Sequence, residues 1–255
     1  MSNMTGLAGK SVIVTGAGSG IGRAAALRFA AAEAKVLVAD LNAETARETV
    51  ELVEAAGGTA VAVAGDLGDQ SVVDQVVDTA VEQFGTVDVL VNNAGIMDRM
   101  SAAADVSDAE WDRVIRVNLT APFMLTRAVL PHMLAAGGGA IVNTASEAGL
   151  RGSAAGAAYT ASKHGVIGLT KNLAVMYRGK GIRANAVAPG GVATNIKVEA
   201  EQGAHGPATI APYFQNIGAV TTAEDQAAAI VFLASDAAAG INGAILPVDS
   251  GWSAV

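Results

Sequence analysis

Short runs of Val, Ile, Leu and Ala recur along the chain, separated by longer stretches in which polar and apolar residues mix. Within the short runs the apolar residues follow one another directly and do not alternate with polar ones. Continuous runs of this kind are typical of strands buried on both faces, as in a parallel sheet covered by helices. Seven strands are expected, at 11–14, 35–39, 59–63, 87–91, 140–143, 183–187 and 244–248.

Helical stretches lie between most of these runs. They include 21–32, 43–56, 71–84, 157–177 and 223–234. The alternation predicts an α/β fold in which a doubly wound, seven-stranded parallel sheet carries helices on both faces. Chains of 255 residues with this alternation commonly form one domain, so we expect residues 1–255 to fold as a single unit.

Segment 194–222 interrupts the alternation after the sixth expected strand. It mixes glycines and prolines with the apolar Ile210, Tyr213 and Phe214. An insertion at the carboxyl end of a strand is well placed to cover a ligand, so the segment is a candidate substrate lid. An ordinary surface loop whose aromatic side chains pack on the core is the alternative.

Composition narrows the classes of function. The chain has no Cys, and His132, His164 and His205 are widely separated, so we expect no metal site, with a carboxylate-only Mg²⁺ site left open. The net charge of −8 argues against nucleic acid or an anionic membrane as partner. No apolar stretch approaches the ~18 residues that cross a bilayer, and the first residues do not resemble a secretory signal. A cytoplasmic protein with a small-molecule partner is expected.

Tyr159 and Lys163 are the first candidates for chemistry. They stand four positions apart in an expected helix, which places both side chains on one face. A phenol loses its proton near pH ~10, and an adjacent positive charge favours the phenolate, so the pair can act as acid and base near neutral pH. Many helix surfaces carry Tyr and Lys at this spacing, so the pair needs support from other residues.

A glycine-rich turn follows the first expected strand. Residues 15–22 read TGAGSGIG, and an expected helix begins within them. Glycines after a strand let the backbone approach a pyrophosphate, while the helix N-terminus supplies free N–H groups and a positive dipole. The spacing from Gly16 to Gly22 is G-x-x-x-G-x-G, which departs from G-x-G-x-x-G. We interpret the turn as a phosphate site of a nucleotide cofactor, with a plain strand-to-helix turn as the alternative.

Asp40 ends the second expected strand. A carboxylate at this point can accept hydrogen bonds from an adenosine ribose and would repel a 2′-phosphate. Leu41 and Asn42 follow it, and the glycine turn carries Ser19 where a cation would serve a 2′-phosphate. These features favour NAD over NADP. A helix cap is the alternative role for Asp40, although Asn42 is better placed for it.

With these motifs in place, the chain resembles the short-chain dehydrogenase/reductase family over nearly its whole length. Residues 15–22 match the family's cofactor motif, and residues 92–95 (NNAG) match its segment after the fourth strand. The family's catalytic tetrad is matched by Asn118, Ser146, Tyr159 and Lys163. The resemblance implies a Rossmann-like fold and NAD(P)-dependent interconversion of an alcohol and a carbonyl compound. Together with Asp40, the expected cofactor contacts are Gly16, Ser19, Gly20, Ile21, Gly22, Asp66, Leu67, Asn93, Tyr159, Lys163, Pro189, Gly190, Val192 and Thr194.

The chemistry of the tetrad fits these implied roles. Hydride transfer at a carbinol carbon requires a proton to leave or join the substrate oxygen, and we expect Tyr159 to exchange it. Lys163 would stabilise the phenolate and reach the nicotinamide ribose, Ser146 would hydrogen-bond the substrate oxygen, and Asn118 would extend a proton path through water. Each has a structural alternative: a solvated charge for Lys163, a helix cap for Ser146 and a packing role for Asn118.

Other polar residues near these motifs also have two interpretations. Asn93 either contacts the cofactor or ties neighbouring strands together. Glu147 either meets a polar substrate group or forms an ion pair with Arg151. His205, near acidic residues of the lid, is better explained by an acidic loop than by a metal.

We therefore expect an NAD-dependent oxidoreductase that interconverts a secondary alcohol and a ketone. An NADPH-dependent reductase of 3-oxoacyl thioesters is the competing enzyme, and a non-catalytic NAD-binding regulatory protein is the competing class. The family resemblance also implies a homotetramer built through long helices that flank the active-site Tyr. The substrate pocket is expected after Ile96, around residues 147–154 and under the lid, and these segments carry no polar pattern that names the substrate.

Overall fold

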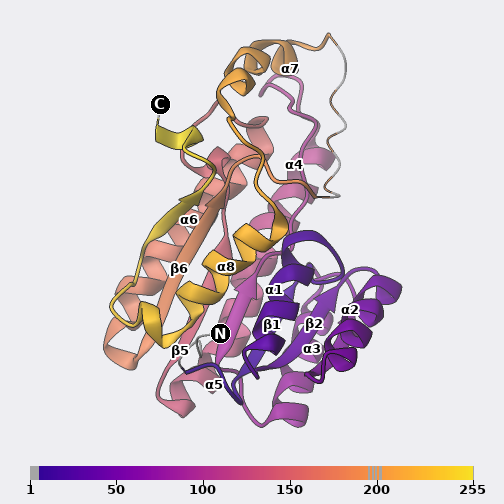
Figure 1. Ribbon diagram of the computed structural model, residues 1–255. Helices are drawn as coiled ribbons and strands as arrows, with labels where there is room; N and C mark the ends of the chain where they lie inside the picture. The colour runs from indigo at the N-terminus through magenta and orange to yellow at the C-terminus, as the bar shows by residue number, and fades with distance from the viewer. Residues whose placement is uncertain (1–5, 195, 197, 199, 201–202, 255) are drawn as a thin grey trace.

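Seven parallel strands form one sheet in the order β3-β2-β1-β4-β5-β6-β7 (Figure 1). The computed structural model describes residues 6–194, 196, 198, 200 and 203–254. The strands are β1 (Ser11–Thr15), β2 (Lys35–Asp40), β3 (Thr59–Ala64), β4 (Val89–Asn92), β5 (Gly139–Thr144), β6 (Ile182–Pro189) and β7 (Ile245–Val248). The chain winds from β1 outward to β3 and then from β4 outward to β7, which is the doubly wound, Rossmann-like arrangement. The predicted fold class is confirmed.

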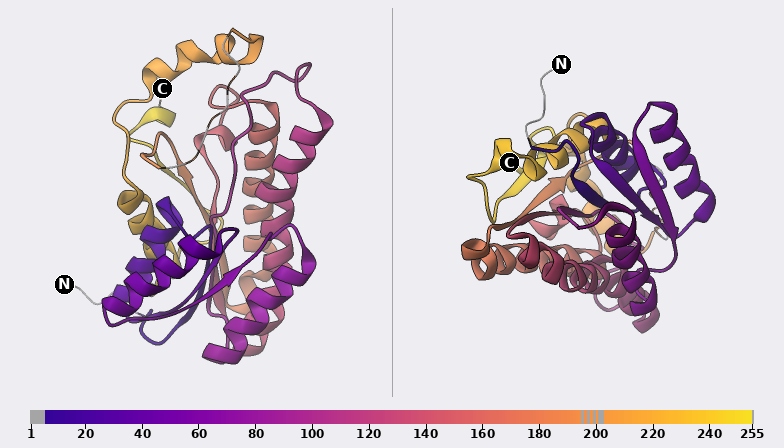
Figure 2. Two further views of the ribbon diagram at one scale, coloured as in Figure 1. Left: turned by 90° about the vertical axis from the view of Figure 1, so that its right-hand side faces the viewer. Right: turned by 90° about the horizontal axis from the view of Figure 1, so that it is seen from below.

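Helices cover both faces of the sheet (Figure 2). One layer holds α1 (Gly20–Ala31), α2 (Ala43–Ala55) and α8 (Ala223–Ala234). The other layer holds α3 (Gln70–Phe84), α5 (Ala121–Ala136) and α6 (Ala157–Tyr177). Successive side chains of a strand point to opposite faces, so Val12 and Val14 join the core under the first layer while Ile13 joins the core under the second. All three are fully buried, as continuous apolar runs predict.

The edge strands β3 and β7 depart from that pattern. Their side chains are partly exposed, because an edge strand has a neighbour on one side only. Pro247 lies within β7, where the proline costs little since an edge strand does not need every backbone N–H for pairing. The predicted burial on both faces is confirmed for the central strands. It was wrong for β3 and β7.

Side-chain caps define several helix ends near the cavity. Asn42 accepts hydrogen bonds from the backbone of Glu44 and Thr45 and so begins α2. Thr222 and Asp225 form a reciprocal capping box at the start of α8. These caps place both helices with their N-termini toward the edge of the sheet where the strands end.

The second layer contains a helix that the strand and helix pattern did not single out. Helix α4 (Asp108–Ile115) continues through a π-helical turn (Arg116–Thr120) into α5. A single π turn inside an α-helix widens the local backbone and is frequent at functional sites. Asn118 lies in this turn, fully buried.

The proposed lid segment lies at the top of the molecule in Figure 1, where α7 (His205–Ile210) is followed by a 3-10 turn (Ala211–Asn216). Residues 195, 197, 199, 201 and 202 of this segment lie outside the described residues. The segment returns to its starting point, because Val192 pairs with Thr221 as an isolated bridge. Gly206 sits so close to the loop after β4 that a Cβ atom would come 2.2 Å from the carbonyl oxygen of Met100.

The remaining short elements are 3-10 turns: Glu147–Gly149, Arg178–Lys180, Asp236–Ala238 and Trp252–Ala254. Across the described part of the chain, no helix is both long and apolar enough to span a membrane.

Candidate functional site

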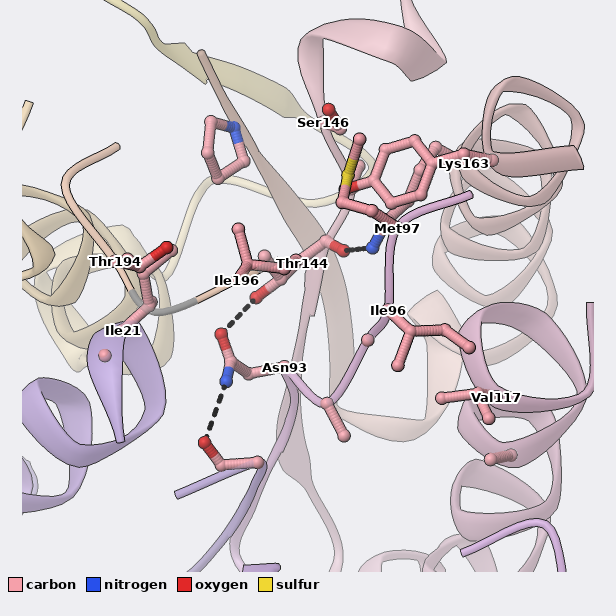
Figure 3. Close-up of a pocket in the computed structure, with 18 of the residues that line it drawn as sticks. Ile21, Asn93, Ile96, Met97, Val117, Thr144, Ser146, Lys163, Thr194 and Ile196 are labelled. Carbon is pink, nitrogen blue, oxygen red and sulfur yellow. Dashed lines mark hydrogen bonds between the residues drawn. The ribbon is translucent and has the colours of Figure 1, made fainter. Parts of the chain in front are cut away.

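A cavity of about 720 Å³ opens where the central strands end (Figure 3). It brings together residues predicted from motifs spread along the whole chain. These are Gly16, Ser19, Gly20, Ile21, Asp40, Asp66, Leu67, Asn93, Ser146, Tyr159, Lys163, Pro189, Gly190, Val192 and Thr194. Two predicted residues, Gly22 and Asn118, lie outside the wall of the cavity. In Figure 3, Ser146, Met97 and Lys163 gather at one end and Ile21 and Thr194 lie at another.

The glycine turn is shaped by close backbone contacts. Gly16 has a φ of +62°, and a Cβ atom there would come 2.9 Å from the Cα of Ala94. At Gly22 a Cβ atom would come 2.2 Å from the carbonyl oxygen of Gly16. Gly22 therefore lets α1 begin directly against the turn. The free N–H groups at the start of α1 face the cavity beside Ser19 and Gly20.

Asp40 supports the glycine turn as well as lining the cavity. Its carboxylate accepts hydrogen bonds from the backbone N of Gly18 at 2.8 Å and of Asn42 at 2.9 Å. Since Asn42 caps α2, the capping role is already filled. A carboxylate offers about four lone-pair sites, so Asp40 keeps acceptor capacity toward a ribose.

The basic residue beside this turn is Arg23, and it is committed to protein partners. Its guanidinium forms an ion pair with Glu48 at 2.8 Å and donates to the carbonyl oxygen of Thr45 at 3.3 Å. It also donates to Thr49 at 3.0 Å. Arg23 is thus held away from the role of a 2′-phosphate ligand.

Asp66 and Leu67 form the far end of the cavity. Asp66 forms an ion pair with Arg116 at 2.8 Å and accepts the backbone N–H of Gly68 at 2.8 Å. These hydrogen bonds, the one from Arg116 above all, lower the pKa of Asp66. Leu67 is buried and offers an apolar surface beside the charged pair. This combination suits a flat heterocycle with polar edges.

A chain of hydrogen bonds across the sheet ends fixes Asn93. Its side-chain nitrogen donates to the carbonyl oxygen of Thr15 at 3.0 Å, and Thr144 donates to its oxygen at 3.3 Å (Figure 3). The Thr15 hydroxyl in turn accepts the backbone N–H groups of Asn93 and Ala94, both at 2.9 Å. Asn93 therefore ties neighbouring strands together and also lines the cavity. Thr15 belongs to the matched glycine motif but was given no role of its own, and Thr144 was not predicted, because a threonine at the end of a buried strand carries no distinctive signal.

Tyr159 lies on α6 with only 8% of its surface exposed. Burial raises the pKa of Tyr159 to about 12, a hydrogen bond with Ser146 opposes that rise, and the charge of Asp98 adds to it. Lys163 was expected to bring the pKa of Tyr159 toward neutrality. This expectation was wrong for the protein without a ligand, because the pKa is raised. The Lys163 nitrogen lies over the aromatic ring, 5.4 Å from its centroid.

Lys163 is buried, with 3% of its surface exposed, so it is not a solvated surface charge. Its ammonium donates to the carbonyl oxygen of Thr144 at 2.8 Å. Burial lowers the pKa of Lys163 to about 8, because removing an ammonium group from water disfavours its charged form. The group still carries its charge at neutral pH.

Ser146 begins the 3-10 turn after β5. Its hydroxyl oxygen accepts the backbone N–H of Ala148 at 3.1 Å, so the capping role proposed as an alternative is present. The same hydroxyl also hydrogen-bonds the phenol of Tyr159 and lines the cavity. The cap fixes the Ser146 side chain next to the phenol.

The side chain of Asn118 holds the loop after β4 by hydrogen bonds to its backbone. Its side chain accepts from the backbone N of Ile96 and donates to the backbone O of the same residue, each at 2.9 Å. It also donates to Ser162 of α6 at 3.2 Å. A Cβ atom on Gly95 would come 3.3 Å from the Asn118 oxygen and 3.6 Å from the Lys163 nitrogen, so both groups approach the same glycine.

Asp98 is a functional candidate that the sequence did not reveal. It is 2% exposed and lies in the loop after β4. Its carboxylate accepts the backbone N–H of Tyr159 at 2.9 Å and of Gly156 at 3.2 Å, at the N-terminus of α6. Asp98 therefore caps α6 from a distant loop and sets the position of Tyr159. A single acidic residue in a loop does not indicate, from sequence alone, that it will contact a distant helix.

Glu147 follows Ser146 directly but does not line the cavity. It is 1% exposed and forms an ion pair with Arg151, as one of its two interpretations expected. Burial and a hydrogen bond with Asp249 raise the pKa of Glu147. His205 begins α7, and its proposed acidic neighbours at 199 and 201 lie outside the described residues. Within the described ranges, no group of three or more His, Asp or Glu side chains is arranged to hold a metal ion.

Known proteins resemble the chain over nearly its full length. Residues 10–205 match the family described as short chain dehydrogenase. The 3β-hydroxysteroid dehydrogenase 2 of Eggerthella lenta is 42% identical over 250 residues, which cover 97% of this chain and 96% of the relative. The crystal structure of levodione reductase superposes with a TM-score of 0.88 at 36% identity, covering 97% of this chain and 99% of the other.

A second solved structure, assigned as an NAD(P)-dependent gluconate 5-dehydrogenase from Beutenbergia cavernae, contains NADP at low occupancy. It superposes with a TM-score of 0.85 at 40% identity and covers 100% of both chains. The family match, the identity of the relatives and the shared fold agree with the resemblance seen in the motifs. The chain belongs to the short-chain dehydrogenase family.

Proposed function

We propose that the protein is an NAD-dependent oxidoreductase that interconverts a secondary alcohol and a ketone, with Tyr159 as the acid and base. The observation that carries this proposal is the placement of Tyr159, Ser146 and Lys163 at one end of a cavity whose other walls suit a dinucleotide. The family supports the class of reaction. The relatives described above are dehydrogenases and reductases by name.

The residues around the cavity fit a bound dinucleotide. The start of α1 would hold the pyrophosphate, Asp40 the adenosine ribose, and Leu67 with Asp66 the adenine. Pro189 at the end of β6 and Gly190 directly after it would face the nicotinamide side. Bound NAD supplies the hydride acceptor or donor at the carbinol carbon.

The chain's own residues handle the proton. Ser146 hydrogen-bonds the substrate oxygen and orients it toward the Tyr159 phenol, which takes the proton during oxidation and returns it during reduction. Lys163 keeps an ammonium charge beside the phenol ring at neutral pH and would donate hydrogen bonds to the nicotinamide ribose. Asn118 would extend the proton path from Lys163 through water, since its side-chain oxygen and the Lys163 nitrogen both lie close to Gly95.

The preference for NAD rests on the surroundings of Asp40. Its carboxylate would repel a 2′-phosphate, and the adjacent Arg23 is engaged by Glu48 and Thr45. The Beutenbergia cavernae neighbour contains NADP at low occupancy, so the shared fold does not by itself select NAD. Asp40 is the feature of this chain that favours NAD.

We also propose that the chain assembles with copies of itself. Phe123 and Leu134 of α5 are 45% and 41% exposed on the outer surface of the second helical layer. Val175 and Met176 near the end of α6 are more exposed still, at 60% and 68%. Apolar side chains on both long helices support the tetramer implied by the family resemblance.

A panel of secondary alcohols tests the function, with NAD⁺ and NADP⁺ supplied separately and reduction followed at 340 nm. We expect turnover with NAD⁺ and a kcat/KM for NAD⁺ well above that for NADP⁺. Strong preference for NADP(H), with turnover of 3-oxoacyl thioesters, would instead identify the competing reductase. Tight NAD binding with no turnover of any alcohol or ketone would identify a regulatory protein.

A further inference from the structure

Trp252 lies after the last strand and reaches the same cavity as Ser146 and Tyr159. Only 5% of its surface is exposed. We propose that Trp252, positioned by Arg151, is the specificity-determining wall of the substrate end of the cavity. It selects secondary alcohols and ketones whose reacting carbon belongs to a flat apolar ring system. The inference rests on the proposed oxidoreductase function.

Arg151 holds Trp252 in two ways. Its guanidinium carbon lies over the indole ring, 4.9 Å from the centroid, in a cation–π contact. It also donates a hydrogen bond to the backbone carbonyl oxygen of Trp252. A contact to the ring combined with one to the backbone fixes both the position and the tilt of the indole.

Arg151 is itself anchored beside the reacting groups. It forms an ion pair with the buried Glu147, the residue directly after Ser146. The carboxyl group of Glu147 also lies beside that of Asp249, and the two can share a hydrogen bond when one of them carries a proton. The loop that carries Ser146 and the segment that carries Trp252 are therefore joined through buried polar contacts.

Asp249 organises the segment around Trp252. Its carboxylate accepts the backbone N–H groups of Gly251 at 3.0 Å and Ser253 at 2.7 Å. Its backbone also packs on Gly190, where a Cβ atom would come 2.7 Å from the Cβ of Asp249. Gly190 follows β6 on the proposed nicotinamide side. The segment that carries Trp252 therefore packs against the part of the site expected to hold the nicotinamide.

The lid segment packs against Trp252 from outside the cavity wall. Phe214 lies against Trp252 with ring centroids 6.1 Å apart and planes tilted by 56°. Tilted aromatic pairs at this separation are favourable. Trp252 thus contacts the lid segment through Phe214 and lines the same cavity as the reacting groups.

The chemistry of the surrounding wall determines the substrate class. Ile96, Met97 and Ala154 pack against the cluster that contains Tyr159, and all three line the cavity. A polyhydroxylated substrate would bury hydroxyl groups against these side chains without hydrogen-bond partners, which is costly. A flat apolar ring instead gains contact with the indole face.

Substrate kinetics test the wall with a ring alcohol, 1-indanol, and an open-chain alcohol, 2-butanol. We expect Trp252→Ala to raise the KM for 1-indanol about 10- to 100-fold, which corresponds to loss of one large apolar contact. The KM for 2-butanol should change less than about 3-fold, because that substrate is too small to use the contact. Trp252→Phe should retain most of the preference for the ring.

Arg151 needs its own variants because it acts through Trp252. Arg151→Met should raise the KM for 1-indanol about 3- to 10-fold more than it raises the KM for 2-butanol. Arg151→Lys should restore part of the preference, since an ammonium group keeps the cation–π contact. Arg47→Met, on the exposed surface of α2, is the matched control that removes an arginine paired with a glutamate elsewhere.

A binding measurement gives a readout that does not depend on turnover. The chain contains 2 tryptophans, so protein labelled with 5-fluorotryptophan gives two fluorine resonances, and Trp111→Phe assigns them. With NAD⁺ present, we expect 1-indanone to shift the Trp252 resonance while Trp111, 41% exposed on α4, stays unchanged as an internal control. Arg151→Met should move the Trp252 resonance before any ligand is added.

The outcomes separate this inference from the proposed function. Wild-type turnover of alcohols together with equal losses for 1-indanol and 2-butanol in Trp252→Ala would overturn the role of Trp252. An unshifted Trp252 resonance on addition of 1-indanone would overturn it as well. Absence of turnover with every alcohol, combined with a shifted Trp252 resonance, would contradict the oxidoreductase function and leave the ring-binding wall standing.

Discussion

Burial acts in opposite directions on the two residues at the centre of the proposed chemistry. It raises the pKa of Tyr159 to about 12 and lowers that of Lys163 to about 8. In each case the neutral form is favoured, because a charge is costly away from water. The proposed reaction requires the charged form of both at some stage. Burial therefore shifts the pKa values of both groups, and a ligand bound beside them would change these values again.

Lys163 should make the stability of the folded protein depend on pH. Its pKa is about 8 when folded against an ordinary value of 10.5, so between these pH values the unfolded chain binds a proton that the folded protein does not. The free energy of unfolding then rises with pH, by about 1.4 kcal/mol per pH unit at most, and this gain is lost as pH falls through 8.

The variant Lys163→Met removes this titration. We expect the difference in unfolding free energy between wild type and variant to increase in favour of wild type from pH 8 to pH 9.5, measured by urea unfolding. The window stays below the range in which Tyr159 titrates. Lys171→Met, an exposed position on the same helix, should show no such trend. A difference that stays flat across this window would contradict a lowered pKa for Lys163.

Asp40 should determine the choice of cofactor. Asp40→Asn removes the negative charge, which weakens a charge-assisted hydrogen bond to the ribose and the repulsion of a 2′-phosphate. We expect the ratio of kcat/KM for NAD⁺ to that for NADP⁺ to fall about 10- to 100-fold. Asp66→Asn, at the adenine end, should weaken both cofactors alike. Equal effects of the two variants on the ratio would refute the assignment of Asp40.

At the scale of elements, the loop after β4 is held between two helices by buried carboxylates. Asp98 binds the N-terminus of α6, and Glu110 of α4 accepts the backbone N–H of Arg99 at 2.8 Å. The backbone O of Ser101 also accepts from Ala157 of α6 at 3.0 Å. The loop thus links the helix of the phenol to the helix that leads to Asn118.

Asp98 should influence the pH dependence of catalysis, whereas Glu110 should not. The charge of Asp98 raises the pKa of Tyr159, so Asp98→Asn should lower that pKa and move the rise of alcohol oxidation with pH to lower pH. Asp98→Asn and Glu110→Gln should each cost about 1–3 kcal/mol of stability, since each weakens acceptance of buried N–H groups. The measurements are urea unfolding and pH profiles of kcat. The same displacement of the profile in both variants would contradict a specific effect of Asp98.

Local sequence patterns predicted the elements better than the contacts between them. The central strands and the start of α1 follow from apolar runs and glycines, and their order follows from alternation. The Asp98 cap joins residues 61 positions apart, and Arg151 reaches a carbonyl 101 positions away. Such pairings depend on how distant segments meet in space, which no periodicity records. The family resemblance located Ser146 and Tyr159 because their motif is local.

At the scale of the whole molecule, the two directions of winding meet at β1 and β4. The loops that follow these strands lie together at this point, and the cavity extends between them. The last segment of the chain returns to the same end of the sheet, where Trp252 closes the substrate side. Residues that follow the first and last strands therefore line one cavity.

Assembly should depend on the outer surface of α5. Light scattering coupled to size-exclusion chromatography should give a particle of four 25.3 kDa chains for wild type. The double variant Phe123→Glu with Leu134→Glu places charges on the exposed apolar surface and should yield smaller species. Leu52→Glu, at a comparably exposed position on α2, should leave the assembly intact. A monomeric wild type, or a double variant of unchanged mass, would contradict the proposed interface.

Single-turnover oxidation of a secondary alcohol by the NAD⁺-loaded protein, followed at 340 nm, is the most direct test of Tyr159. Tyr159→Phe should slow the formation of NADH about 10²- to 10⁴-fold, because the group that takes the proton is gone. Its affinity for NADH should stay within about 3-fold of wild type, since the ring remains in place. Tyr213→Phe, an exposed tyrosine of the lid segment, serves as the control and should react at the wild-type rate. A wild-type rate in Tyr159→Phe would contradict the proposed mechanism.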